Sequence, residues 1–491
     1  MAETILPGVY IEVRPEGLIV PGRVTVGNLG IVGTASKGEI GKPIVLGSYA
    51  EARERFGSYD AWNEGKGELT LVRALELAYA HGATTVVAVR VADDAAKASS
   101  YPLLKSASGD AIVALSAKSE GTWGDGLSIN ISKSNEDAFV EDEEHPGSAT
   151  IALKHKPVVK STRNRILVKG RVRQLIYDDA TDPLRPGQIK IDRKAGTLTF
   201  PPGEEPPAAD KVVASYIVDK DEAVKVTLRY GRAEEVYIVV SYKDLERDIN
   251  NPNKGSAWVT ATVTANEDEL PPKDASKDVF APFLGGANGA VGANYTIGLE
   301  KLLDQDVQII VAAGQDDSFG DELDAHCQNA STDAIKRDRI AVVGTGNLGN
   351  DASASLNKVT EHTLASDRVI LVAPGIKVTD NAAESPKEVT LPGAYAAAAV
   401  AGLLSSLPPH FSPTNKTLRV GGLEHRYTDA GLGQLVKSRV LALEQRQGFR
   451  IVKGITTSTN TAWTQITTRR IVDYAKYGVR SAANSYIGLL N

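Results

Sequence analysis

The sequence is poor in cysteine, in net charge and in long apolar runs. Its 491 residues include one cysteine, Cys327, which excludes an internal disulfide and a cysteine-based metal cluster. Lys and Arg number 55 against 61 Asp and Glu, whereas a dedicated nucleic-acid binder needs a basic excess to neutralise phosphates. The longest apolar stretch, residues 395–407, is shorter than the ~20 residues that cross a bilayer. The N-terminus has no basic segment followed by an apolar core, so we also expect no secretory signal.

What the sequence does contain indicates a folded protein of several domains. The hydrophobic fraction of 42% is enough to fill real cores, unlike that of a disordered chain. At roughly 100 to 200 residues per domain, the length predicts about three to four domains. With 45 Gly and 23 Pro but only 6% aromatic residues, we expect many turns and close backbone contacts.

The two ends of the sequence show an α/β pattern. Residues 9–13 form a short β-rich run between Pro7 and Pro15, which cannot bury itself alone and must pair with another strand. A helix over 68–81 and a strand over 85–91 complete a small N-terminal α/β unit. From residue 297 onward, apolar strands alternate with helices, which predicts a parallel sheet covered on both faces. The expected strands are 307–313, 339–343 and 368–373, and the expected helices are 321–336, 351–365, 393–407, 432–444 and 467–490.

The middle of the sequence has a different character. Between residues 105 and 265, β-branched runs alternate with polar residues and turn clusters recur. This pattern predicts an antiparallel β insertion, such as one sandwich or barrel. Residues 267–283 are acidic, Pro-rich and loop-like.

One glycine-rich loop matches a nucleotide-binding pattern. Residues Gly344-Thr345-Gly346-Asn347-Leu348-Gly349 read G-x-G-x-x-G between a predicted strand and a predicted helix, where glycines would let the backbone approach a pyrophosphate. However, the next strand ends in Ala373-Pro374-Gly375, so no carboxylate is placed to hold a ribose hydroxyl. Asp351 also puts an acid, not a phosphate, at the helix start. A βα turn of the parallel sheet is the better interpretation.

No catalytic or metal-binding constellation is evident in the sequence. The seven histidines are scattered, and neither H-E-x-x-H nor G-x-S-x-G occurs. Cys327 is expected to be a small buried hydrophobe. Residues 141–144 are all acidic and could hold a cation, but a solvated hairpin turn is the favoured interpretation. We therefore expect no catalytic residue, no cofactor and no metal.

The last predicted helix carries a charged stripe. Arg469, Asp473, Lys476 and Arg480 follow one another at spacings of four, three and four, opposite an apolar face that includes Ile471 and Val479. One interpretation is an exposed face with i,i+4 ion pairs such as Arg469–Asp473. The other is a docking surface for an acidic partner.

The order of several segments resembles the contractile tail sheath family, which is shared by contractile-tailed phages, phage-like bacteriocins and contractile injection systems. These segments bracket almost the whole chain, and their order and spacing make the match specific. They are Leu6-Pro7-Gly8-Val9-Tyr10-Ile11-Glu12, Gly30-Ile31-Val32-Gly33-Thr34-Ala35-Ser36-Lys37-Gly38, Pro43-Ile44-Val45, Phe56-Gly57, Leu391-Pro392-Gly393-Ala394-Tyr395-Ala396-Ala397, Gln447-Gly448-Phe449-Arg450-Ile451-Val452-Lys453-Gly454-Ile455-Thr456-Thr457 and Arg469-Arg470-Ile471-Val472-Asp473.

The resemblance implies a multidomain α/β fold. Its core would be a subtilisin-like parallel α/β domain without the protease residues, over 23–104 and 266–390. An antiparallel β domain inserted at 105–265 would face outward, and a C-terminal α+β domain at 391–491 would face an inner tube. Residues 1–22 would be an arm that carries a strand for pairing with a neighbouring subunit. This strand consists of Val9, Tyr10, Ile11, Glu12 and Val13.

The resemblance also implies a non-enzymatic structural role. Copies of the chain would form hexameric rings stacked helically around a tail tube, and contraction would drive the tube through a target envelope. Expected partners are the chain itself, the tube protein, the baseplate and the tail terminator, with no nucleic acid and no membrane insertion. Tube contacts would come from Arg469, Lys476 and Arg480.

Three questions stay open from the sequence alone. The alternative function is a nucleotide-binding α/β enzyme that uses the loop Gly344–Gly349. Sheath proteins usually continue beyond the equivalent of Asn491, so we interpret this sequence as a shortened form or a fragment. The source is a phage, a bacteriocin or an injection system, and the protein would accordingly assemble into a virion tail in the host cytoplasm or into a particle in the bacterial cytoplasm.

Overall fold

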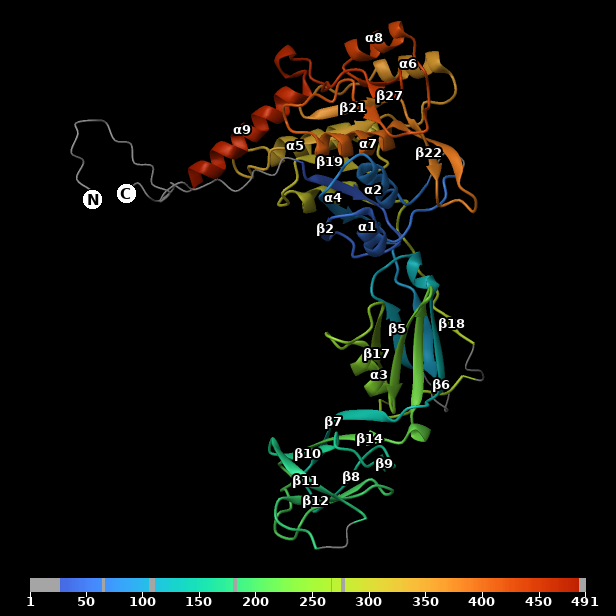
Figure 1. Ribbon diagram of the computed structural model, residues 1–491, viewed down its shortest axis with the longest axis vertical. Helices are drawn as coiled ribbons and strands as arrows, with labels where there is room; N and C mark the ends of the chain where they lie inside the picture. The colour runs from blue at the N-terminus through green and yellow to red at the C-terminus, as the bar shows by residue number, and fades with distance from the viewer. Residues whose placement is uncertain are drawn as a thin grey trace, which may run out of the picture. The chain divides into compact units, whose positions relative to one another are not determined.

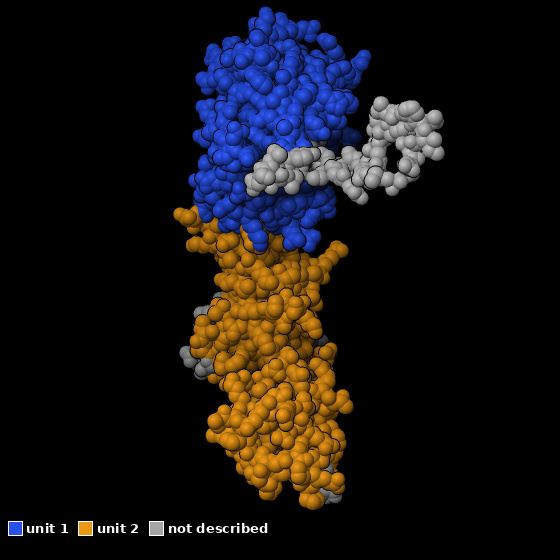
Figure 2. All heavy atoms as spheres, turned by 90° about the vertical axis from the view of Figure 1, so that its left-hand side faces the viewer, with its two compact units in different colours: residues 1–35, 40–93, 290–491 blue, residues 36–39, 94–289 orange. Residues whose placement is uncertain are grey.

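A computed structural model of the chain describes residues 27–63, 67–105, 111–179, 183–265, 267–274 and 279–484. The contacts among residues divide the chain into two compact units, coloured separately in Figure 2. Unit 1 comprises residues 1–35, 40–93 and 290–491, and unit 2 comprises residues 36–39 and 94–289. Unit 2 is therefore inserted into the sequence of unit 1.

Unit 1 is built on a nine-stranded sheet, which Figure 1 shows with helices on either side. The six central strands, from β3 to β26, run parallel, and antiparallel strands close both edges. The strands in spatial order are β2 (Pro43–Leu46), β3 (Val86–Arg90), β1 (Leu29–Gly33), β19 (Ile309–Ala312), β20 (Ile340–Gly344), β21 (Val369–Ala373), β26 (Leu441–Gln445), β27 (Phe449–Ile451) and β24 (Thr417–Leu418).

The central strands are apolar on both faces because helices cover both faces. All residues of β1, β3, β19, β20 and β21 are buried, and each strand is a short run rich in Val, Ile, Leu or Ala. The parallel register places Leu29 beside both Val86 and Ile309. The parallel, doubly covered sheet predicted from the sequence is therefore present.

The helices of unit 1 form two layers, one on each face of the sheet. Side chains from α1, α2 and α7 join one hydrophobic core, and side chains from α4, α5, α6 and α8 join the other. The long helix α9 also belongs to this unit. The bounds are α1 (Tyr49–Phe56), α2 (Leu71–Ala80), α4 (Tyr295–Leu302), α5 (Gly320–Ala330), α6 (Ala352–Thr360), α7 (Gly393–Ser406), α8 (Asp429–Lys437) and α9 (Ile466–Asn484).

The C-terminal segment 391–491 contributes to the same sheet and cores. It supplies α7 to one layer, α8 to the other, and β26 to the sheet beside β21. A smaller antiparallel sheet, of β23 (Lys387–Leu391), β22 (Ile376–Asp380) and β25 (Gly422–Leu423), lies in this half of the sequence. The helix predicted over 432–444 was wrong in its second half, because the chain leaves α8 at Lys437 and enters β26.

Unit 2 contains two hydrophobic cores, so the single sandwich or barrel suggested by the sequence was wrong. One core lies between a four-stranded and a three-stranded sheet with α3 (Tyr242–Ile249), and the other lies within an eight-stranded arrangement. The first core uses β16 (Ala233–Val239), β15 (Val224–Tyr230), β6 (Leu127–Lys133), β18 (Ala281–Pro282), β17 (Val259–Val263), β5 (Ala111–Ala117) and β4 (Ser100–Lys105). The second uses β7 (Ala138–Pro146), β14 (Lys211–Val218), β10 (Arg165–Val168), β11 (Arg171–Tyr177), β12 (Gln188–Asp192), β13 (Thr197–Thr199), β8 (Thr150–Ala152) and β9 (Val158–Val159).

Candidate functional site

The charged stripe of α9 packs against the rest of unit 1. Arg469 bonds Asp367 at 2.9 Å and Asp473 at 2.7 Å, so the predicted i,i+4 ion pair is present. Asp473 in turn receives two hydrogen bonds from the guanidinium of Arg368. The side chains of Arg469 and Arg368 are only 7% and 5% exposed, which places these pairs inside the protein and not on its surface.

Asp338 connects the second half of the stripe to the sheet. Its carboxylate accepts hydrogen bonds from Lys476 and Arg480, each at 2.5 Å, and from Arg368 at 3.4 Å. Arg480 also pairs with Asp333, whose side chain is 97% exposed. Asp338 itself is 2% exposed, so one buried carboxylate holds three cations.

The partners of the stripe come from residues that directly precede two buried strands. Asp338 lies just before β20, and Asp367 and Arg368 lie just before β21. Because neighbouring parallel strands begin at the same edge of a sheet, these charges gather there. The sequence alone did not lead to these residues, although charges immediately before two consecutive apolar strands were a usable signal.

The orientation of α9 differs from the exposed charged face considered in the sequence analysis. The stripe faces the body of unit 1, and the opposite apolar face is the exposed one, with Ile471 at 44% and Val479 at 68% exposure. The reason is that Asp338, Asp367 and Arg368 offer buried ionic partners at the sheet edge. Arg469, Lys476 and Arg480 are thus paired within the chain, and their contact with a tube stays a prediction.

Burial sets the electrostatics of this cluster. It raises the pKa of Asp473, while the nearby Arg368 and Arg469 guanidiniums oppose that rise. The two guanidiniums thus offset part of the cost of burying this carboxylate, since an isolated buried charge is costly.

The loop Gly344–Gly349 is filled by protein groups. A Cβ on Gly344 would lie 1.8 Å from the carbonyl oxygen of Gly393, so this glycine allows β20 and α7 to approach each other. Asp351 caps α6 by accepting hydrogen bonds from two backbone N–H groups, and Glu424 accepts one from the backbone of Leu348. Two carboxylates therefore occupy the donors that a phosphate would need, which supports the βα turn.

The polar groups considered for catalysis have structural contacts instead. His326 packs against Arg339, and burial together with that guanidinium lowers the histidine's pKa to about 4. Arg339 donates to the carbonyls of Leu302, Leu303 and Gln305 at the end of α4. Cys327 is fully buried, which raises the pKa of its thiol to about 12 and leaves it a poor nucleophile.

The acidic run 141–144 lies in strand β7, so the predicted hairpin turn was wrong. β7 pairs with β14, and Glu143 accepts hydrogen bonds from the Tyr216 hydroxyl and the Lys154 backbone. Among the residues that the structure describes, no group of three or more His, Cys, Asp or Glu is arranged to hold a metal ion. Within the same residues, no helix combines the length and the apolar character needed to cross a membrane.

The predicted intersubunit strand, Val9, Tyr10, Ile11, Glu12 and Val13, lies outside the described residues. The first described residue is Gly27, next to Asn28, which bonds to the loop before β19.

Comparisons with known proteins locate a family domain in unit 1. Residues 288–457 match the family model of the phage tail sheath protein central domain. This segment begins just before α4 and ends after β27. It includes α7, α8 and four of the six parallel strands, namely β19, β20, β21 and β26. No curated protein matches the chain.

Two solved structures share the fold over most of the chain. The sheath tail protein of Desulfitobacterium hafniense is 15% identical, with 98% of this chain and 83% of that chain covered and a TM-score of 0.57. The sheath tail protein Lin1278 of Listeria innocua is 12% identical, with coverages of 94% and 78% and a TM-score of 0.54. The family resemblance predicted from the sequence is therefore confirmed: residues 288–457 match the phage tail sheath central domain, in a chain with the fold of solved sheath tail proteins.

Proposed function

We propose that this chain is a non-enzymatic structural subunit of a contractile tail sheath. Copies form rings that stack helically around an inner tube, and contraction of the stack drives the tube through a target envelope. The observation that carries the proposal is the match of residues 288–457 to the tail sheath central domain. The filled loop Gly344–Gly349 and the buried Cys327 favour this role over a nucleotide-binding enzyme.

The proposal assigns a role to each part of the chain. Residues 23–104 and 266–390 would form a subtilisin-like α/β core, the insertion at 105–265 would face outward, and the segment 391–491 would face the tube. Residues 1–22 would be the arm that adds a strand to a neighbouring subunit. The further partners are the baseplate and the tail terminator, and assembly takes place in the cytoplasm of a bacterial cell.

Electron microscopy of the purified full chain tests the proposal directly. We expect sleeves or stacked rings. Uniformly monomeric particles, together with a thermal shift on adding nucleotide, would support the enzyme instead and refute the sheath.

Deleting residues 1–14 tests the arm. We expect the shortened chain to remain folded and monomeric while it loses polymerisation, because the deleted strand 9–13 would add to a neighbouring subunit. The matched comparison is the full chain at the same concentration, with folding checked by circular dichroism. Unchanged polymerisation would remove the arm from the proposal.

The tube part of the proposal rests on Lys476 and Arg480, which keep 35% and 23% of their side chains exposed, whereas Arg469 is nearly buried. Replacing both with Gln should weaken co-assembly with tube protein, and more so at low ionic strength, where exposed charges are least screened. The control is Lys437→Gln, a surface lysine of α8. Equal co-assembly of both variants would contradict tube contact by α9.

A further inference from the structure

Two short chain segments connect the two cores of unit 2. The second core is built mainly from residues 138–218, which are inserted between β6 and β15 of the first core. Residues 134–137 therefore lead from β6 into β7, and residues 219–223 lead from β14 back into β15. The backbone N–H of Lys220 donates to the Asp137 carboxylate at 3.0 Å, which ties the two segments together. We call the parts around the two cores the first-core half and the second-core half.

The end of β16 lies between the two cores. Tyr237 and Val239 are buried in the first core, whereas Val240, which directly follows the strand, is buried in the second. Ile238 also packs against the second core. Successive side chains of this extended stretch thus point into different cores, as the two-residue period of a strand allows. The halves are therefore held together by apolar contact at the end of β16.

A cleft separates the two halves next to this contact. Its walls are β7 of the second-core half and α3 of the first-core half, which lie close together in Figure 1. Ser241, the residue after Val240, also lines it. The cleft has about 540 Å³ of room for water. The halves are thus packed tightly at the end of β16 and are separated by solvent beside it.

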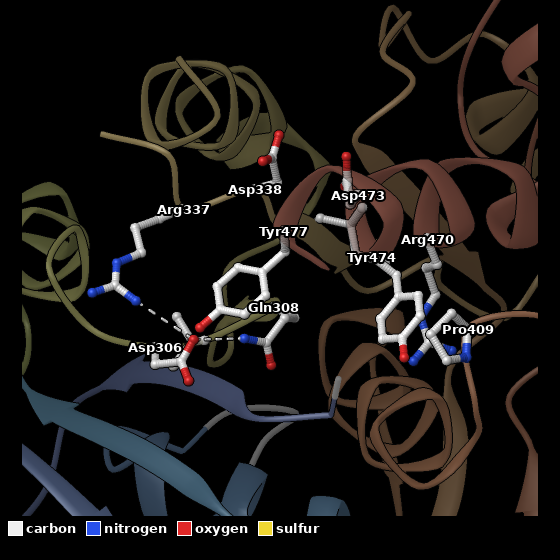
Figure 3. Close-up of a pocket in the computed structure, with 11 residues that line it drawn as sticks. Asp306, Gln308, Arg337, Asp338, Pro409, Arg470, Asp473, Tyr474 and Tyr477 are labelled. Carbon is white, nitrogen blue, oxygen red and sulfur yellow. Dashed lines mark hydrogen bonds and ion pairs between the residues drawn. The ribbon is translucent and has the colours of Figure 1, made fainter. Parts of the chain in front are cut away.

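The groove between α9 and the sheet of unit 1 is different. It has about 40 Å³ of room for water. Figure 3 shows that the Asp306 carboxylate in this groove is already bonded by Arg337 and by the Gln308 side chain. The cleft of unit 2 is therefore the larger of the two hollows.

The charged groups on each wall of the cleft have partners in their own half. On β7, Glu144 pairs with Lys211 of the neighbouring strand at 2.7 Å. On α3, Arg247 pairs with Asp244 at 2.8 Å. Widening the cleft leaves these pairs intact, so it does not leave a buried charge without a partner.

The bonds that bridge the cleft are weak by comparison. The Lys154 ammonium, in the second-core half, donates to both carboxylate oxygens of Asp268, in the first-core half, at 2.8 and 2.9 Å. These two side chains are 40% and 50% exposed, so water can replace the ion pair at little cost. Arg247 donates a longer bond, of 3.4 Å, to the Glu141 carbonyl.

We propose that the second-core half moves relative to the first-core half about the end of β16, and that the Lys154–Asp268 ion pair is a latch that holds the cleft closed. The segments 134–137 and 219–223 absorb the movement, as short connections do at hinges. Breaking the latch should raise the ratio of open to closed chains by up to about fivefold, the equivalent of about 1 kcal/mol. The inference concerns a single chain and holds whether or not the chain polymerises, so it goes beyond the proposed function.

Spin-label distances in the full chain at low concentration, measured by electron paramagnetic resonance, test the inference. One label is attached at Thr199→Cys, on an exposed position of β13 in the second-core half, and the other at Thr260→Cys, on an exposed position of β17 in the first-core half. The reference pair, Ala233→Cys with Thr260→Cys, lies wholly in the first-core half. The native Cys327 is fully buried and takes up little label.

We expect the distances between positions 199 and 260 to be spread more widely than those of the reference pair, because only the first pair spans the cleft. Lys154→Gln should enlarge the open population by up to about fivefold. The matched control is Lys160→Gln, because Lys160 pairs with Asp179 at similar exposures, of 53% and 52%, but wholly within the second-core half. Equal distributions for the two variants would overturn the latch. A spread no wider than the reference in every variant would overturn the movement itself.

A swapped ion pair distinguishes the latch from a general loosening of the fold. Lys154→Asp places a like charge opposite Asp268 and should open the cleft further than Lys154→Gln does. Adding Asp268→Lys restores an opposite-charge pair and leaves the summed charge of the cleft as in the unmodified chain. The distances should then return toward those of the unmodified chain. If the double variant stays as open as Lys154→Asp alone, this ion pair is not the latch.

Discussion

Asp338 offers the sharpest test of how α9 is held. Asp338→Asn keeps the shape of the side chain but removes the charge that faces Lys476, Arg480 and Arg368. Breaking a buried ion pair by removing one partner costs about 3–5 kcal/mol. Lys476 and Arg480 are 35% and 23% exposed and regain some hydration, so we reduce the expected cost to about 2–3 kcal/mol.

The matched control is Asp333→Asn. Asp333 also pairs with Arg480, at 2.9 Å, but its side chain is 97% exposed. Exposed pairs contribute about 0–1 kcal/mol, so this variant should behave almost like the unmodified chain. The two substitutions therefore separate burial from simple charge removal at the same helix.

Hydrogen exchange of the α9 amides is the appropriate assay, because it reports local opening without assuming that a two-unit chain unfolds in one step. A loss of about 2–3 kcal/mol corresponds to exchange about 30- to 150-fold faster in Asp338→Asn. Exchange in β19 and β3 serves as an internal reference. A change below about fivefold, or one equal to that of Asp333→Asn, would refute the view that a buried carboxylate anchors α9.

Two further predictions concern stability. The pKa of His326 is lowered to about 4 from 6.5, first by burial and then by Arg339, so the unfolded chain binds a proton more readily between these values. The free energy of unfolding that depends on a neutral His326 is fully present above about pH 6.5. About 3 kcal/mol of it is lost as the pH falls toward 4. Urea denaturation at several pH values should show this loss in the unmodified chain and a flatter profile in His326→Gln; parallel profiles would contradict it. The second prediction compares two helical glycines. A Cβ on Gly402 of α7 would lie 2.3 Å from the Ala78 carbonyl oxygen, whereas one on Gly478 of α9 would meet nothing within 4 Å. Gly402→Ala should therefore destabilise by about 1–3 kcal/mol and Gly478→Ala should stabilise by about 0.5–1 kcal/mol. Thermal unfolding checks both signs, and a common sign would show that the packing argument fails.

The sheet of unit 1 was predictable because its signal is local. Runs such as residues 339–343 and 368–373 are short, apolar on both faces and separated by helical segments, a pattern typical of buried parallel strands. The observed strands Ile340–Gly344 and Val369–Ala373 agree to within a residue. Their pairing follows from the same pattern, because consecutive βα units tend to lie side by side.

The predictions that were wrong depended on long-range partners. Residues 432–444 are apolar enough for one helix, but β21 offers an open edge that takes Leu441–Gln445 as a strand. In unit 2, the strands are short and alternate regularly, so their sequence identifies them without saying which pair with which. Two cores form there because β7 and β14 pair with each other in one sheet, while β6 and β15 pair with each other in another.

Helix α9 shows the same limit at the candidate site. Its periodicity separates an apolar face from a charged face, but the direction each one points depends on the neighbouring surface. Four cations and four carboxylates meet at the sheet edge, namely Arg368, Arg469, Lys476 and Arg480 with Asp333, Asp338, Asp367 and Asp473.

The equal numbers of cations and carboxylates in this cluster limit how α9 could contact a tube. Because the charges of the cluster cancel within the chain, an acidic surface approaching α9 does not meet a free basic patch. It must compete with Asp338 and Asp333 for Lys476 and Arg480, and the exposed partner, Asp333, is the easier one to displace. Attachment through α9 should therefore strengthen in Asp333→Asn, which removes the exposed one of the two carboxylates paired with Arg480. Asp338→Asn should weaken attachment by loosening the helix. If Asp333→Asn instead weakened attachment, the cations of α9 would not be the tube-binding groups.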